Sequence, residues 1–79
     1  MTVRVELCSF LRRYLPRYDP VEGIVVEVGA KTPVDRVMDA LGIPSESVEI
    51  ITINRLAVKG EHLLEEGDLV GLFTTPGGG

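Results

Sequence analysis

The sequence predicts an α+β fold, in which a mixed sheet of four to five strands is covered on one face by one main helix. Three observations support this fold class. Short apolar segments with the two-residue alternation typical of strands lie toward both ends of the chain. One segment, at about residues 33–41, instead spaces its apolar residues as a helix does. A single helix of this length, placed between strands, can cover only one face of a small sheet.

The first predicted strand spans residues 2–9, where Val3, Val5 and Leu7 alternate with more polar residues. Cys8 falls on the polar face of this strand. It is the only cysteine of the chain, so it belongs to no CxxC pair, and no histidine lies near it in the sequence. We therefore interpret Cys8 as a structural or incidental residue rather than a redox thiol.

The next segment is basic and leads into a second strand. Three of the eight basic residues lie between positions 12 and 17. Because no glycine-rich loop accompanies them, we interpret this stretch as a solvated loop face rather than a phosphate site. Turn residues at Asp19-Pro20 and Gly23 precede a strand over residues 24–28, which returns antiparallel to the first. Residues 10–15 can form one or two helical turns that group four side chains, Phe10, Leu11, Tyr14 and Leu15.

The helix has clear start and stop signals. Thr32 is expected to cap it, Pro33 to occupy the first helical position and Asp35 the third. Gly42 is expected to end it. Its apolar stripe, which predicts burial against the sheet, consists of Val34, Val37, Met38 and Leu41.

The second half of the chain predicts two strands joined by a tight turn. A strand over residues 48–53 is followed by the turn residues Asn54-Arg55 and a short strand over residues 56–58. We expect Leu63-Leu64 to plug the core from a loop, and residues 65–68 to form an exposed acidic turn.

The last strand, residues 69–73, places Val70 and Leu72 on one face. The element order strand, strand, helix, strand, short strand, strand is that of the β-grasp, or ubiquitin-like, fold. If one face of the last strand packs beneath the helix, the opposite face has apolar residues exposed near the C-terminal end of the chain. An exposed apolar patch beside a flexible terminus is typical of a docking surface. The residues expected to form this partner-docking surface are Phe73, Leu69 and Phe10.

Composition excludes several functions. A net charge of −4 argues against non-specific nucleic-acid binding, and no apolar run approaches the length of a membrane helix. With one cysteine and a first strand that begins at residue 2, we expect a cytoplasmic domain without a signal segment. His62 stands alone and is interpreted as a surface histidine. The sequence shows no catalytic triad, metal-spaced cluster or phosphate loop, so we expect no catalytic residue, no metal and no bound cofactor.

The C-terminal residues 74–79 contain three consecutive glycines after Pro76. Glycines pay a high entropy cost for being ordered and offer no side chain to pack. We therefore expect a β-grasp domain over residues 1–73 and a flexible tail over residues 74–79. Taken alone, such a tail is either a frayed end or an arm that presents a terminal carboxylate to another protein.

Several residues together resemble the ThiS/MoaD family of sulfur carrier proteins, over essentially the full length. They are the Phe10-Leu11-Arg12 cluster after the first strand, the turn residue Asn54, the Gly67-Asp68 pair before the last strand, and the terminal Gly78-Gly79. The length and the Phe10-Leu11-Arg12 cluster are closer to MoaD, the small subunit of molybdopterin synthase. The sequence departs from the MoaD pattern at two places that bear on which pathway it serves. Thr74-Thr75 stands where prolines are common in MoaD proteins, and Asn54 is not followed by the usual glycine.

The resemblance implies a mechanism that centres on Gly79. An activating enzyme would adenylate the Gly79 carboxylate with ATP, and sulfur from a persulfide would displace AMP to leave a thiocarboxylate. The carrier itself would bind no cofactor, and it would be a covalent co-substrate rather than an enzyme. Gly78, Gly77 and Pro76 would allow the tail to enter a narrow channel, because glycine has no Cβ to obstruct it.

The resemblance also implies the partners. These are an ATP-dependent adenylyltransferase of the MoeB or ThiF type, and a molybdopterin synthase large subunit of the MoaE type. A ThiG-type thiazole synthase, serving thiamine biosynthesis, is the alternative acceptor. No nucleic-acid or membrane partner is expected. Two other functions stay open, a ubiquitin-like protein modifier that forms isopeptide bonds and a β-grasp interaction module with an idle tail.

Overall fold

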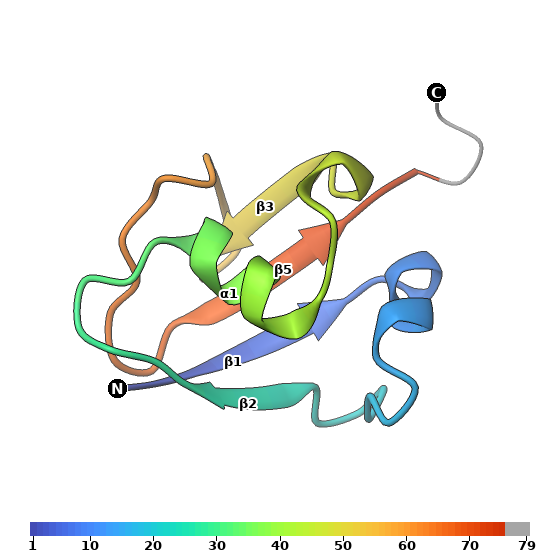
Figure 1. Cartoon of the computed structure of the whole chain (residues 1–79), viewed down its shortest axis with the longest axis horizontal. Coiled ribbons are helices and arrows are strands. Elements are labelled where there is room, and N and C mark those ends of the chain that lie inside the picture. Colours follow the sequence, from blue (N-terminus) through green and yellow to red (C-terminus); the bar gives the residue numbers. More distant parts are fainter. Residues whose placement is uncertain (76–79) are drawn as a thin grey trace.

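A computed structural model of the protein describes residues 1–75 (Figure 1). The element order is strand, 3₁₀ helix, strand, α-helix, 3₁₀ helix, and three further strands. The elements are β1 (Thr2–Leu7), η1 (Ser9–Tyr14), β2 (Ile24–Glu27), α1 (Val34–Leu41), η2 (Ser45–Ser47), β3 (Ile50–Ile53), β4 (Leu56–Val58) and β5 (Leu69–Phe73).

The strands form one mixed sheet in the order β2-β1-β5-β3-β4. The first and last strands, β1 and β5, pair in parallel at its centre, with Val5 opposite Val70. All other neighbours are antiparallel. Figure 1 shows α1 crossing one face of this sheet, over β5 and β1. The predicted α+β fold, with five strands and one main helix in the β-grasp arrangement, is confirmed.

The core lies between α1 and the face of the sheet that carries the odd-numbered residues of β1. Val5, Val34, Val37, Val70 and Leu72 are each fully buried. Burial of each such side chain contributes about 1.5–3 kcal/mol, which makes this layer the main source of stability. The connections add three further buried side chains, Leu11, Ile43 and Leu64.

The start of α1 differs from the prediction. Pro33, not Thr32, precedes the first helical residue, and no side chain caps the helix. The Thr32 hydroxyl instead donates to the Gly29 carbonyl at 2.5 Å. The backbone N–H groups of Val34 and Asp35 donate to loop carbonyls of residues 62 and 60, at 3.0 Å each. The long loop after β4 therefore supplies the acceptors that a capping side chain would have supplied. Gly42 ends the helix in the left-handed conformation, as predicted.

The segment after β1 also differs from the prediction. It forms the 3₁₀ helix η1, with three residues per turn, so it does not gather the four predicted side chains on one buried face. Leu11 is fully buried, whereas Phe10 is 38% exposed. The predicted strand over residues 2–9 ends at Leu7, and the strand predicted over residues 48–53 begins only at Ile50.

The turns behave largely as predicted. Asn54 and Arg55 both have positive φ, 51° and 74°, as a two-residue hairpin turn requires. Asp19 and Gly23 close the turn before β2 through a 2.8 Å backbone bond. In the loop after β4, Leu64 is buried but Leu63 is 50% exposed, so only one of the two leucines plugs the core.

Candidate docking surface and base of the C-terminal tail

The C-terminal end of β5 is held between two other strands. The Cys8 N–H donates to the Leu72 carbonyl at 3.2 Å, and the Glu49 N–H donates to the Phe73 carbonyl at 2.9 Å. Thr74 and Thr75 follow directly. The end of β5 and the 3₁₀ helix η1 lie at the same end of the molecule, the right-hand end in Figure 1. The base of the tail therefore leaves from the central strand of the sheet, whose position the ladder bonds on both sides define.

The Glu49 carboxylate accepts hydrogen bonds from Thr74 and Thr75. One of its carboxylate oxygens accepts the Thr74 hydroxyl at 3.0 Å and the Thr75 N–H at 3.2 Å. The Thr75 hydroxyl lies 2.8 and 3.0 Å from the two carboxylate oxygens. The hydroxyl of Thr75, then its N–H, and then the hydroxyl of Thr74 hold the pKa of Glu49 below its usual value. We call this set of bonds, between Glu49 and residues 74–75, the tail clasp.

Cys8 stands on the other side of the tail base. Its Sγ lies 3.8 Å from the Thr74 carbonyl oxygen, and the side chain is half-buried. This is a weak sulfur contact at the end of β1. The interpretation of Cys8 as a structural or incidental residue stays a prediction.

Phe73 forms the apolar part of the surface on the sheet face opposite α1. Its ring lies over Gly71, where an added Cβ would come within 2.7 Å of the ring and closer still to the Thr52 hydroxyl. Phe73 is 37% exposed, and its register partner on β3, Ile50, is 47% exposed. The absence of a side chain at Gly71 therefore lets the Phe73 ring pack against the sheet at this position, a role that the sequence pattern does not reveal.

The other two predicted docking residues lie apart from Phe73. Leu69 shares the open face with Phe73 but stands at the opposite end of β5, about 13 Å away along the strand. Phe10 belongs to η1, and the Arg13 guanidinium stacks over its ring at 4.2 Å from the centroid. Phe10 and Phe73 thus lie toward the same end of the molecule, and Leu69 marks the far end of the open face.

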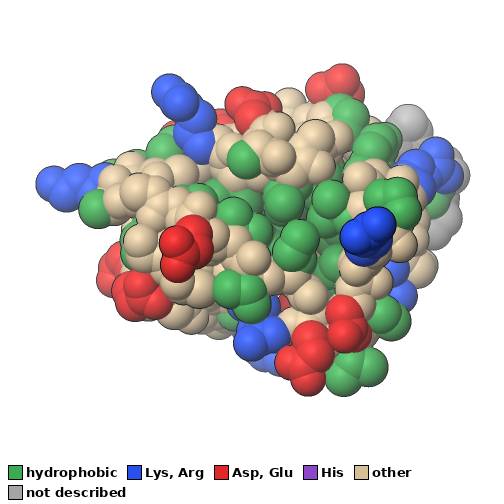
Figure 2. All heavy atoms as spheres, turned by 60° about the horizontal axis from the view of Figure 1, so that its bottom comes forward, with side chains coloured by type: hydrophobic (Ala, Val, Ile, Leu, Met, Phe, Trp, Pro, Cys, Tyr) green, Lys and Arg blue, Asp and Glu red, His purple; other side chains and the backbone are tan. Residues whose placement is uncertain are grey.

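The basic stretch at residues 12–17 is only partly a solvated surface. Arg12 is half-buried, because its Nε donates to the Leu7 carbonyl at 3.2 Å and its guanidinium packs over Tyr18. The Tyr18 hydroxyl in turn accepts the Leu7 N–H at 2.9 Å. Arg13 and Arg17 are exposed. In Figure 2, Lys and Arg side chains stand at both ends of the molecule, including the right-hand end that holds η1.

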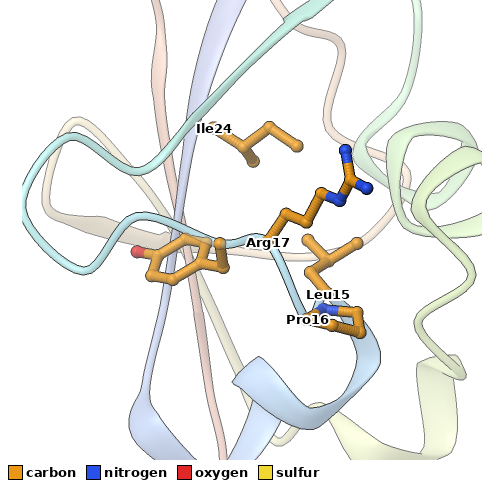
Figure 3. Close-up of a pocket in the computed structure, with 5 residues that line it drawn as sticks. Leu15, Pro16, Arg17 and Ile24 are labelled. Atoms are coloured by element: carbon orange, nitrogen blue, oxygen red, sulfur yellow. The ribbon is translucent and has the colours of Figure 1, made fainter.

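A separate apolar pocket of about 290 Å³ lies beside β2. Its lining consists of Leu15, Pro16, Arg17, Tyr18 and Ile24. Figure 3 shows Leu15 and Ile24 on either side of the Arg17 side chain. Further apolar side chains are gathered on the face that Figure 2 turns toward the viewer. This pocket shares no lining residue with the tail base.

The start of β5 is held by a second carboxylate, that of Asp68. This side chain is only 8% exposed, which corrects the prediction of a wholly exposed acidic turn. Its two oxygens accept the Asn54 side-chain amide at 3.0 Å and the Glu65 N–H at 2.8 Å. The side-chain oxygen Oδ1 of Asn54 accepts the Leu69 N–H at 3.0 Å. Two of the residues that carried the family resemblance, Asn54 and Asp68, therefore bond to each other and to the first residue of β5.

The predicted tail residues Pro76, Gly77, Gly78 and Gly79 lie outside the described residues. Within residues 1–75, no group of three His, Cys, Asp or Glu side chains is placed to hold a metal ion. Over the same range, no helix is both long enough and apolar enough to cross a membrane.

Comparison with known proteins agrees with this architecture. The sequence model of the family described as Mut7-C ubiquitin matches residues 1–75. A crystal structure of SAMP1 from Haloferax volcanii superimposes with a TM-score of 0.76 at 19% identity, covering 100% of both chains. A crystal structure of the H. volcanii small archaeal modifier protein 1 gives 0.70 at 17% identity, covering 91% of this chain and 94% of the other. No curated protein sequence matches the chain. The ubiquitin-like match fits the ThiS/MoaD resemblance that the sequence indicates.

Proposed function

The chain belongs to the Mut7-C ubiquitin family, and on this premise we propose that it is a sulfur carrier whose Gly79 carboxylate is converted to a thiocarboxylate. The observation that carries the proposal is the placement of the tail base. Thr74 continues the central strand of a β-grasp sheet, with the exposed Phe73 beside it. A partner that docks against the rigid body at this surface lies beside Thr75, the last described residue before the glycines.

The chemistry of the proposal needs no acid or base from the carrier. An oxygen of the Gly79 carboxylate attacks the α-phosphate of ATP, and pyrophosphate leaves. The terminal sulfur of a persulfide then attacks the acyl carbon, and AMP leaves to give an acyl disulfide. A thiol cleaves the disulfide and releases the thiocarboxylate. The six residues after Phe73 extend at most about 20 Å, which is enough to enter a neighbouring active site.

The docking surface of the proposal is the exposed apolar surface close to the tail base. Phe73 and Phe10 lie toward that end of the molecule, and Leu69 extends the open face away from it. The proposed partner is an adenylyltransferase of the MoeB or ThiF type. Apolar side chains at the tail base would bring Gly79 into its nucleotide site, and Gly78, Gly77 and Pro76 would pass through the channel.

The finer proposal concerns the sulfur acceptor. The Phe10-Leu11-Arg12 cluster favours a molybdopterin precursor, which makes the chain the small subunit of a synthase with a MoaE-type large subunit. A thiazole precursor on a ThiG-type synthase is the alternative. The two acceptors are distinguished by reconstitution: the thiocarboxylate form is incubated with each large subunit and its precursor, and transfer of labelled sulfur to one product identifies the pathway.

A second candidate function is protein modification. It is favoured by the fold shared with a protein from H. volcanii that is described as a small archaeal modifier. In this version, a lysine amine attacks the acyl carbon of the Gly79 adenylate, AMP leaves, the amine loses a proton, and an isopeptide bond forms. Lysine-linked conjugates in a cell extract, lost when Gly79 is deleted, would support it.

The experiment that tests the proposal is an activation assay on the full chain. The protein is incubated with ATP, a persulfide source, a thiol and the ubiquitin-activating-like adenylyltransferase encoded in the same genome, and its intact mass is measured. We expect one oxygen-to-sulfur exchange at Gly79. The matched control is the chain that ends at Pro76, because deletion of Gly79 alone would leave Gly77-Gly78 as a new terminal di-glycine. The mass of the protein purified from cells first establishes that Gly79 carries a free carboxylate.

Two results would overturn the sulfur-carrier proposal. One is an unchanged mass with every adenylyltransferase of the source genome. The other is an equal exchange in the chain that ends at Pro76. If conjugates form while no thiocarboxylate accumulates, the protein is a modifier. If deletion of Gly78-Gly79 changes neither assay, the domain is an interaction module.

A further inference from the structure

Glu49 holds three donors of the tail base, and each belongs to a residue beyond the last ladder bond of β5. The ladder ends where the Glu49 N–H donates to the Phe73 carbonyl. The hydroxyl groups of Thr74 and Thr75 and the Thr75 N–H all point to the Glu49 carboxylate, at 2.8–3.2 Å. The carboxylate is therefore not needed to complete the sheet.

We propose that Glu49 is a positioning residue, which aligns the base of the tail for entry into the activating enzyme. The proposal rests on the proposed function and adds a residue to it. Glu49 precedes the first residue of β3, and the register Ile50 to Phe73 makes Thr74 its neighbour across the strands. Through its side chain, β3 continues to hold the chain for two residues after the backbone pairing ends.

The chemistry suits a reversible hold. A carboxylate that accepts hydroxyl and N–H donors forms charge-assisted bonds, which are stronger than bonds between neutral groups. All of these groups are at the surface, and water competes for each of them. The clasp therefore biases the direction of Thr74 and Thr75 and opens without the cost of exposing a core.

The side chains at positions 74 and 75 are suited to this role. Both are threonines, and each brings a hydroxyl that donates to Glu49, which a proline at either position would lack. Thr75 also keeps a backbone N–H, which proline does not have. Where proline restricts the backbone covalently, the Thr74-Thr75 pair obtains its restriction from Glu49. Because fewer conformations of the tail base must be lost on docking, the clasp lowers the cost of binding rather than the barrier of the chemical step.

The first test is the mobility of the tail base in the full chain. Heteronuclear ¹⁵N relaxation is measured for the Thr74 and Thr75 amides in the native sequence and in Glu49→Ala. We expect the Thr75 order parameter to fall in Glu49→Ala. Glu46→Ala is the matched control, because Glu46 is an exposed glutamate in the nearby η2. Thr75→Val should loosen Thr75 as Glu49→Ala does, whereas Thr75→Ser keeps the hydroxyl and should behave as the native chain.

The second test separates positioning from a general structural effect. The rate of thiocarboxylate formation is measured at increasing carrier concentration. We expect Glu49→Ala and Thr75→Val to raise the KM for the carrier about threefold to tenfold and to leave kcat within about twofold. Glu46→Ala and Thr75→Ser should match the native chain in both constants.

Each outcome has a defined meaning. An unchanged Thr75 order parameter in Glu49→Ala overturns the proposal, and so does a loss of kcat with no change in KM. If the native chain forms no thiocarboxylate, the sulfur-carrier function fails, and the relaxation data alone confirm or overturn the hold of Glu49 on the tail base.

Discussion

The two ends of β5 are held by two carboxylates in opposite environments. At its start, Asp68 is 8% exposed and bonds to the Asn54 amide and the Glu65 N–H. At its end, Glu49 is exposed and bonds to Thr74 and Thr75. Asp68 accepts from two segments, the turn after β3 and the loop before β5, whereas Glu49 accepts from residues 74–75 alone.

Burial decides what each carboxylate can do. The Asp68 carboxylate is buried and depends on the Asn54 amide and the Glu65 N–H for its hydrogen bonds, so this set is an integral part of the fold. The donors held by Glu49 exchange their partner for water at little cost, so that set can open. The same chemistry thus produces a fixed start and a releasable end of one strand.

The largest effect is expected at the buried end. Asp68→Ala removes a buried carboxylate that accepts two charge-assisted hydrogen bonds, from the Asn54 amide and the Glu65 N–H, and we expect it to lower the free energy of unfolding by about 2–3 kcal/mol. Urea unfolding of the full chain measures the change. The control Glu61→Ala, at an exposed loop position, should stay within about 0.5 kcal/mol. A loss as small as that of the control would show that the buried bonds are not integral to the fold.

A second prediction separates the turn from the side-chain bonds at Asn54. Asn54→Gly removes the bonds to Asp68 and Leu69 but tolerates the positive φ, and we expect a loss of about 1–2 kcal/mol. Asn54→Ala adds the cost of a left-handed alanine, about 1 kcal/mol more. Urea unfolding of both variants, each also combined with Asp68→Ala, measures the coupling. Simple additivity would contradict a shared network.

The third prediction concerns the middle of the strand, where Gly71 accommodates the Phe73 ring. An alanine here has a Cβ that meets both the ring and the Thr52 hydroxyl, so Gly71→Ala should lower stability by about 1–3 kcal/mol. The ring should also turn away from the sheet. NMR shifts of the Phe73 ring protons test the second part, and shifts unchanged from the native chain would show that the strand yields instead of the ring.

The smallest effect is expected at the exposed end of β5, as a change in the pKa of Glu49. The hydroxyl of Thr75 is the main cause that lowers the pKa of Glu49 below its ordinary value of 4.5. A lowered pKa in the clasped state means that the clasp is fully formed above the ordinary pKa and is lost as the pH falls through the lowered one. NMR titration of the Glu49 side chain should show this, and Thr75→Val should move the pKa upward. An equal pKa in both chains would contradict the clasp.

The sequence allowed most of the fold to be predicted because its local signals agree with one another. The stripe Val34, Val37, Met38 and Leu41 located α1 to within one residue, and Gly42 marked its end. The alternation in β1 and β5 identified the buried faces. These predictions depend on spacing along the chain, which is set by the periods of 3.6 and 2 residues.

The candidate site was predictable only in part. Phe73 and the resemblance of Asn54 and Asp68 to family positions were visible in the sequence. Glu49 was not, because it lies 25 residues before Thr74 and no local pattern links a glutamate to two threonines across that distance. A register-based argument could have found it, since pairing of Ile50 with Phe73 places Glu49 opposite Thr74.

The amino-acid sequence by itself determined the elements, the face that each strand buries and the glycine-rich tail, because these follow from side-chain chemistry at fixed spacings. Only the tertiary structure decided which partners form hydrogen bonds with the polar groups at the ends of the helix and the strands. Loop carbonyls at residues 60 and 62 replaced Thr32 at the start of α1, and Glu49 took the hydroxyl groups beyond the end of β5. Polar groups at the ends of elements bond to whichever partner the fold brings within about 3 Å, and that partner depends on contacts between distant segments.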